Sequence, residues 1–150
     1  MNYEIVNLNE KIVAGYCDKT SNCSPDMGQV IGELWRKFYS DEGYFDIPNK
    51  TSEKALGIYT DYKSDEKSEY TVMVACEVEN TDIPDKFAVR KIPAGKYAKF
   101  IVRGNTITAV REFWEKLWKM NLERSFIYDF EEYQNSDFEN AEIHIYISIK

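Results

Sequence analysis

The sequence predicts an α+β fold in which two β-α-β-β units, related by a pseudo-twofold axis, form an antiparallel sheet with two main helices flanking a central cleft. Each of two amphipathic helices is preceded by a strand-like segment and followed by two more. The helices also share residues, since Trp35 aligns with Trp114 and Lys37 with Lys116. Short amphipathic helices resemble one another by composition, so the matching order of elements is the stronger indication of a duplication.

The first helix is predicted to begin at Ser24 and Pro25, which would supply the N-cap and the first helical position. Glu33 and Lys37 are spaced for an ion pair on its outer side. Its inner face is an apolar stripe at helical spacing, made of Met27, Val30, Ile31, Leu34, Trp35 and Phe38.

The second helix is predicted to start at Asn105 or Thr106 and to run through Met120. Its apolar stripe comprises Ile107, Val110, Phe113, Trp114, Leu117 and Trp118. For either tryptophan of this stripe, packing in the core is the commoner role. A position at the cleft is the functional alternative.

Apolar and aromatic segments bounded by polar residues, Gly or Pro predict the strands. The polar segment 17–24, ahead of the first helix, is expected to be a loop. The expected strands lie within residues 3–16, 55–62, 70–78, 87–92, 96–102, 126–133 and 142–149.

The chain is expected to form a single domain over 1–150, with internal repeats over about 1–80 and 86–150. In the strand after each helix, Tyr62 aligns with Tyr133 and Thr60 with Glu131. This alignment predicts that the repeat loses its symmetry at a charged residue.

The composition is that of an ordinary soluble globular domain, with 43% hydrophobic and 30% charged residues. The net charge of −7 and the lack of a basic run argue against a direct nucleic-acid partner, because phosphate backbones are bound by clustered Lys and Arg. No apolar run approaches a membrane span, so no membrane partner is expected. The aromatic content, 15%, is high, and aromatic side chains fill cores as well as line pockets for flat molecules and cations.

The cysteines and the histidine predict neither a zinc site nor a disulfide framework. Cys17, Cys23 and Cys76 are odd in number and have no C-x-x-C spacing, and His144 is the single histidine. The N-terminus lacks the basic and apolar regions of a secretion signal. We therefore expect no metal, no cofactor and a reduced, cytoplasmic setting.

The stretch Phe126–Tyr133, which reads FIYDFEEY, combines carboxylates with large aromatic side chains. In a regular strand, Phe130 and Glu132 would point to one face, and Asp129 and Glu131 to the other. A buried carboxylate is costly without a partner, so Glu131 is either a solvated acid on an edge strand or a residue kept for a ligand. Asp129 and Glu131 could share a proton if they are buried together, and two solvated acids are the alternative.

Three segments carry a resemblance to a known family: Ile92–Ala98 (IPAGKYA), Phe130–Tyr133 (FEEY) and the closing strand Glu142–Ile149. With the Trp-bearing helix between them, they resemble the GyrI-like small-molecule-binding domain. That domain is the effector-binding module of many AraC-type and MerR-type bacterial regulators, and it also occurs as a stand-alone protein. The resemblance implies the duplicated fold and a groove for lipophilic, often cationic or polyaromatic compounds. It also implies that Glu131, the acidic residue of the Phe-Glu-x-Tyr strand, belongs to the pocket.

The first functional hypothesis is a stand-alone protein that senses or sequesters a lipophilic, cationic or aromatic small molecule. Aromatic walls would provide stacking and cation–π attraction, and a partly desolvated Glu131 would provide the counter-charge. The residues expected to bind this ligand are Glu131, Tyr133, Trp114, Trp118, Tyr146 and Tyr59.

Two alternative functions belong to other classes of protein, an enzyme and a protein-interaction module. As an enzyme, the protein would use Glu131 as a general base on water that attacks an electrophilic small-molecule toxin, since the resemblance extends to stand-alone hydrolases. No Ser-His-Asp or Cys-His arrangement and no phosphate loop is recognisable. As an interaction protein, it would use its acidic surface to inhibit a large enzyme. No helix-turn-helix precedes the first strand, so we expect any role in transcription to need a separate protein partner.

Overall fold

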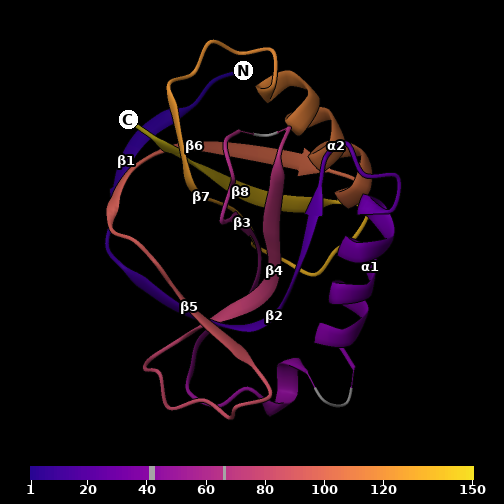
Figure 1. Ribbon diagram of the computed structural model, residues 1–150, viewed down its shortest axis with the longest axis vertical. Coiled ribbons are helices and arrows are strands. Elements are labelled where there is room, and N and C mark those ends of the chain that lie inside the picture. The colour runs from indigo at the N-terminus through magenta and orange to yellow at the C-terminus, as the bar shows by residue number, and fades with distance from the viewer. Residues whose placement is uncertain (41–42, 66) are drawn as a thin grey trace.

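The computed structural model describes residues 1–40, 43–65 and 67–150, and it confirms the α+β fold (Figure 1). Within these residues, eight strands form one antiparallel sheet that is accompanied by two α-helices and a short 3-10 helix. The elements in chain order are β1 (Glu4–Leu8), β2 (Lys11–Ser21), α1 (Met27–Phe38), the 3-10 helix η1 (Tyr44–Asp46), β3 (Lys50–Thr60), β4 (Glu69–Val78), β5 (Ala88–Ile92), β6 (Gly95–Gly104), α2 (Thr106–Leu117), β7 (Arg124–Tyr133) and β8 (Ala141–Ile149).

The order of the strands in the sheet shows the duplication directly. The order is β1-β6-β8-β7-β3-β4-β2-β5. If β1 to β4 are exchanged with β5 to β8, the same list is obtained in reverse, as a twofold axis between the central strands β3 and β7 requires. The two repeated units are β2-α1-β3-β4 and β6-α2-β7-β8. Each is preceded by a strand that pairs with the other unit, because β1 pairs with β6 and β5 pairs with β2.

Both helices cover the same face of the sheet, and each covers its own core. Under α1, Leu34 and Phe38 pack with side chains of β2, β3 and β4. Under α2, Phe113 and Leu117 pack with isoleucines of β8 and with residues of β6. The central strands β3 and β7 therefore lie between two separately packed helices, where a cleft can form.

The opposite face of the sheet curls on itself and is packed as a third core. Its buried or partly buried side chains come from all eight strands, including Val6 on β1, Ala88 on β5 and Phe130 on β7. A curled sheet buries this face without a second layer of helices.

Several element boundaries differ from those predicted by the sequence. Residues 17–21 are not a loop but continue β2, because β4 supplies hydrogen-bonding partners as far as the Ser21–Glu69 pair while the polar side chains at 17–19 face solvent. The helix α1 begins after Asp26 rather than Ser24, and the Ser24 hydroxyl bonds to the Asp26 carboxylate. The predicted start of α2 is confirmed, and the Asn105 side chain accepts hydrogen bonds from its first turn, but α2 ends at Leu117 rather than Met120.

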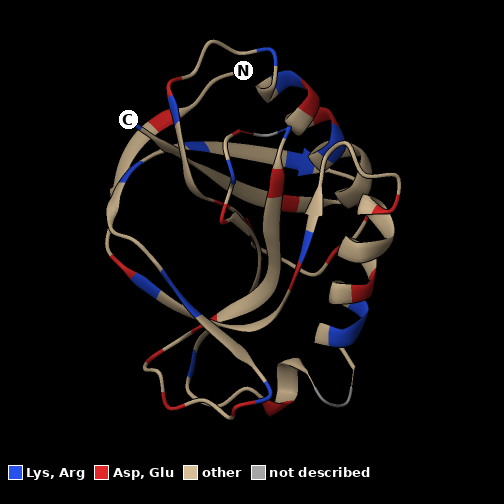
Figure 2. Cartoon of the chain, viewed as in Figure 1, with Lys and Arg blue, Asp and Glu red and all other residues tan. Residues whose placement is uncertain are grey.

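Charged residues of both signs occur in the helices, strands and loops of the protein. Figure 2 shows acidic and basic residues interspersed along both helices, and no stripe of a single sign stands out in this view. Among the described residues, no helix has the length and apolar character needed to cross a membrane.

Candidate functional site

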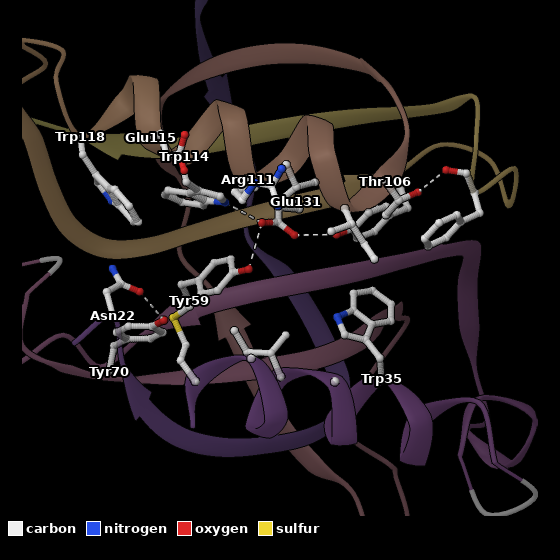
Figure 3. A pocket seen from close by; sticks show the side chains of 18 of the residues that line it. Asn22, Trp35, Tyr59, Tyr70, Thr106, Arg111, Trp114, Glu115, Trp118 and Glu131 are labelled. Atoms are coloured by element: carbon white, nitrogen blue, oxygen red, sulfur yellow. Dashed lines mark hydrogen bonds between the residues drawn. The ribbon is translucent and has the colours of Figure 1, made fainter. Parts of the chain in front are cut away.

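A cavity of about 1040 Å³ lies between α1 and α2. Its floor includes residues of the central strands β3 and β7, and its walls come largely from the facing sides of the two helices. Figure 3 shows this arrangement, with Trp114 of α2 and Trp35 of α1 on opposite sides of Glu131. The cleft that the duplicated fold predicts is therefore present at the pseudo-twofold axis.

Glu131 lies on the floor of the cavity, at the junction of the two repeats. It is 2% exposed and stands directly opposite Gly57 of β3 in the register of the sheet. A Cβ atom at Gly57 would lie 3.0 Å from the Glu131 Oε1 atom and 3.5 Å from the Trp35 ring. The missing side chain at Gly57 therefore makes room for the carboxylate.

Three neutral donors hold the Glu131 carboxylate. Oε1 accepts a hydrogen bond from the Tyr133 hydroxyl at 2.7 Å. Oε2 accepts from the Tyr59 hydroxyl at 2.9 Å and from the Trp114 indole N–H at 2.8 Å. Within the described part of the chain, none of the ion pairs involves Glu131. A buried negative charge is thus hydrogen-bonded but lacks a positive partner.

The electrostatics of the site follow from this burial. Loss of hydration raises the pKa of Glu131, and the hydrogen bonds from Tyr133, Trp114 and Tyr59 oppose the rise because they favour the charged form. Burial, with the nearby Glu131 charge, raises the pKa of Tyr59 and Tyr133 well above the ordinary value of 10.0, so both hydroxyls keep their protons and act as donors. The same causes raise the pKa of Tyr70 to about 12.

Aromatic rings surround this carboxylate at contact distance from one another. The Trp35 ring stands perpendicular to Tyr133 with centroids 5.1 Å apart. The Tyr59 ring meets Trp114 at 5.3 Å and Tyr70 at 5.9 Å, both edge to face. Such walls attract cations and flat apolar molecules.

Asp129, two residues before Glu131 on the same strand, is held by different partners. It is fully buried, and its carboxylate bonds to the Arg124 guanidinium at 2.6 Å, to the Tyr62 hydroxyl at 2.6 Å and to the backbone N–H of Ser148 at 2.9 Å. The expectation that Asp129 and Glu131 share a proton or lie in solvent is therefore wrong, because each carboxylate is buried with its own set of partners.

Five of the six predicted ligand-binding residues line the cavity. Glu131, Tyr133 and Tyr59 lie at its centre, Trp114 contacts them, and Trp118 is 42% exposed among the lining residues at the end of α2. These positions are consistent with the predicted roles.

Tyr146 lies elsewhere. It pairs with Phe130 across β7 and β8 and stacks on that ring at 4.7 Å, on the curled face of the sheet. Its neighbour Ile145 is the residue opposite Glu131. Because successive side chains alternate between faces, Tyr146 points away from the cavity.

The alignment of Thr60 with Glu131 is also wrong. Tyr59 shares the cavity face with Glu131, so the next residue points to the other face, and the Thr60 hydroxyl donates to the backbone oxygen of Ile127. In the sheet, Gly57 faces Glu131, and each is followed two residues later by a tyrosine that donates to the carboxylate. The repeats are therefore related by Gly57 with Glu131 and by Tyr59 with Tyr133.

His144 contacts Glu142, with 2.8 Å between Nε2 and Oε2. Within the described residues, no group of three or more His, Cys, Asp or Glu side chains is placed to hold a metal ion.

The sequence analysis missed several lining residues, among them Trp35, Tyr70, Tyr62 and Tyr39. One signal could have identified Trp35: it aligns with Trp114, and symmetry places both at the cleft. The tyrosines carried no such signal, because the direction of Tyr62 and Tyr70 depends on how β3 ends and β4 begins, and that of Tyr39 on how α1 ends.

Comparison with known proteins assigns the chain to a protein family. Residues 4–149 match the family model Cass2, described as an integron-associated effector binding protein. No curated protein sequence is significantly similar to the chain.

Solved structures with the same fold are similar over nearly the whole length. An integron cassette protein from Vibrio cholerae is 25% identical, with a TM-score of 0.77, over 99% of this chain and 95% of that one. A protein named SAV2435, solved bound to tetraphenylphosphonium, is 21% identical, with a TM-score of 0.80, over 100% and 94%. A transcription regulation protein from Staphylococcus aureus is 20% identical, with a TM-score of 0.77, over 100% and 99%. The chain belongs to the family of integron-associated effector binding proteins, and it is a small-molecule-binding protein with the GyrI-like fold.

Proposed function

We propose that this protein binds lipophilic organic cations in the cavity between α1 and α2 and acts as a sensor or sequestering protein for them. The observation that carries the proposal is Glu131, a buried carboxylate whose hydrogen-bond donors among the described residues are all neutral and which is surrounded by aromatic rings. A carboxylate in such a place has lost its hydration without gaining a cation. A cationic ligand would supply the missing charge.

Two features favour an organic cation over a metal ion. The walls are aromatic, and they offer cation–π attraction and apolar contact rather than further oxygen ligands. The volume of about 1040 Å³ lies at the upper end of the range for drug-sized ligands. The tetraphenylphosphonium bound to SAV2435, a protein with the same fold, is a ligand of this chemical class.

The same geometry makes general-base catalysis the less favoured function. An ionised carboxylate has about four acceptor positions, and three of these are used by Tyr133, Tyr59 and Trp114. Strong donors also lower the basicity of the oxygens that a base would use. Binding requires the charge of Glu131, whereas catalysis would require its free lone pairs.

Calorimetric titration with tetraphenylphosphonium tests the proposal. We expect binding to the wild-type protein, and an affinity about 5- to 150-fold lower for Glu131→Gln, since a charge-assisted contact contributes about 1–3 kcal/mol. A thermal shift measured in parallel reports binding to the folded state. Unchanged affinity in the Glu131→Gln variant, or no binding to the wild type, would contradict the proposal.

A further inference from the structure

The cavity extends to both sides of Glu131, and its two ends are built differently from its centre. Figure 3 shows Trp35 and Thr106 towards one end, Trp118 and Tyr70 towards the other, and Glu131 between them. The two oxygens of the Glu131 carboxylate also have different partners, since one accepts from Tyr133 and the other from Tyr59 and Trp114. A charge bound at Glu131 would therefore sit in the middle of the cavity rather than at one end.

The first end, which we call the Trp35 lobe, is largely aromatic. It is formed by Trp35, Tyr39, Tyr133, Ile107 and Phe138. Trp35 stacks on Tyr39 with centroids 6.1 Å apart and meets the edge of Tyr133 at 5.1 Å. Phe138 is held beside the start of α2, since its backbone oxygen accepts hydrogen bonds from the N–H and the hydroxyl of Thr106.

The second end, which we call the Tyr70 lobe, is a separate aromatic surface. It is formed by Tyr59, Tyr62, Tyr70, Met27 and Trp118. The Tyr70 ring contacts Tyr62 at 5.7 Å and Tyr59 at 5.9 Å, and the Tyr70 hydroxyl is fixed by a 2.7 Å bond to the Asn22 side chain. Tyr62 is fixed in turn by Asp129. This lobe is therefore held in shape before any ligand enters.

The charges of the lining residues define one central cation position. Glu131 is the buried acidic residue among them, whereas Glu115 and Asp137 are exposed. Of the basic lining residues, Arg111 is exposed and Arg124 is buried against Asp129. Asp129, which is buried nearby, is already paired with Arg124. A second positive charge at either end would thus find aromatic rings but no buried counter-ion.

We propose that the ligands of this cavity are monocations that carry an aromatic group on each of two opposite sides of the charge. The charged centre is bound over Glu131, one aromatic group enters the Trp35 lobe, and the other enters the Tyr70 lobe. This inference rests on the proposed function, and it specifies the shape of the ligand that the proposed function leaves open.

The test compares three probes by calorimetric titration: benzyltrimethylammonium with one ring, dibenzyldimethylammonium with two, and the neutral N,N-dibenzylformamide. We expect the two-ring cation to bind at least about tenfold tighter than the one-ring cation, because its second ring removes further apolar surface from water. We expect the neutral two-ring probe to bind more weakly than the two-ring cation.

Two exposed aromatic residues provide a matched pair of variants that do not endanger the fold. Phe138→Ala truncates the Trp35 lobe at a side chain that is 51% exposed, and Trp118→Ala truncates the Tyr70 lobe at one that is 42% exposed. Each should lower the affinity for the two-ring cation severalfold, and only one of them should affect the one-ring cation. Phe45→Ala, at an aromatic residue that is 79% exposed and outside the cavity, is the control and should change neither affinity.

The outcomes separate this inference from the proposed function. If Glu131→Gln weakens both cations but the second ring adds no affinity, cation binding stands and the two-lobed ligand is ruled out. If only one of the two lobe variants affects the two-ring cation, the ligand uses a single lobe and the inference is again wrong. If neither cation binds, or the neutral probe binds as well as the two-ring cation, both proposals fail.

Discussion

Two carboxylates on one strand, Asp129 and Glu131, face the same side of the sheet and are equally buried, yet their surroundings differ. Asp129 has an internal cation, Arg124, whose guanidinium also lies 4.2 Å from the Phe126 ring centroid. Glu131 has three neutral donors and an open cavity in front of it. Burial alone therefore does not indicate a binding site. A buried charge becomes a candidate for ligand binding when the protein satisfies its hydrogen bonds but leaves its charge uncompensated.

The largest effect is expected at the compensated carboxylate. Asp129→Asn keeps the size of the side chain but removes the buried negative charge that is paired with the Arg124 guanidinium. Removing one partner of a buried pair typically costs about 3–5 kcal/mol, so the free energy of unfolding should fall by about that amount. Urea denaturation of the variant and the wild type measures it. A loss below about 1 kcal/mol would show that Asp129 is not the main partner of Arg124.

The uncompensated carboxylate should instead show its charge in the pH dependence of binding. The pKa of Glu131 is raised above its ordinary value of 4.5, so the folded protein without ligand takes up a proton at a higher pH than the unfolded chain does. Affinity for tetraphenylphosphonium, whose charge does not change with pH, should fall as the pH drops through this raised pKa. At lower pH the loss approaches about tenfold per unit. In Glu131→Gln the affinity should be independent of pH in this range, and a parallel pH dependence in both proteins would contradict the assignment.

The raised pKa of Glu131 also makes the stability of the protein depend on pH. The sign of this dependence is opposite to that of a salt-bridged acid, whose pKa is lowered. Between 4.5 and the raised pKa, the folded state binds more protons than the unfolded state. The contribution of Glu131 to the free energy of unfolding therefore decreases as the pH rises through this window and is constant above it. The difference in stability between the wild type and Glu131→Gln, measured by urea denaturation at several pH values, isolates this contribution.

A smaller effect is expected from a substitution at Gly57, which changes only the surroundings of Glu131 and leaves Asp129 as it is. In Gly57→Ala, the new methyl group would lie 3.0 Å from Oε1, so the carboxylate must move away from it and from the Tyr133 hydroxyl. A weaker hydrogen bond favours the charged form less, and the pKa of Glu131 should rise further. We expect a severalfold loss of cation affinity at neutral pH and a shift of the binding profile to higher pH. Phe45→Ala, outside the cavity, is again the control and should change neither the affinity nor its pH profile.

The sequence predicts the local features of this protein well. It predicts poorly the features that depend on which strands are paired and in which register. Helix periodicity, the Asn105 cap and the repeated order of elements are local, and they were sufficient for the two helices, the antiparallel sheet and the position of the cleft. The family resemblance, with the pattern at Phe130–Tyr133, was sufficient to select Glu131 as the pocket acid. These features required no knowledge of which strands are neighbours.

The remaining properties depend on register. Tyr146 was assigned to the wrong face because it is adjacent to Ile145 in a strand, and only the pairing with β7 shows which of the two side chains lies on the face of Glu131. The partners of Asp129 could not be predicted because the register of β7 shifts between Arg124 and Asp129, and Phe126 adopts a positive φ of 54° there. Such a bulge brings Arg124 to Asp129, which strict alternation would not indicate.

The smallest expected effect is on the stability of Glu131→Gln at neutral pH, and the hydrogen-bond geometry explains why it should be small. Trp114 and Tyr59 both donate to Oε2, so the amide oxygen of Gln can take that position and accept both bonds. The amide nitrogen then takes the place of Oε1 and donates to Tyr133, whose hydroxyl can act as an acceptor as well as a donor. The substitution keeps three hydrogen bonds and removes a charge that burial disfavours. We therefore expect the free energy of unfolding to stay within about 1 kcal/mol of the wild type or to increase, while cation affinity falls. A loss of 3 kcal/mol or more in urea denaturation, comparable with Asp129→Asn, would show that both carboxylates are structural and that the contrast between them is not a signature of ligand binding.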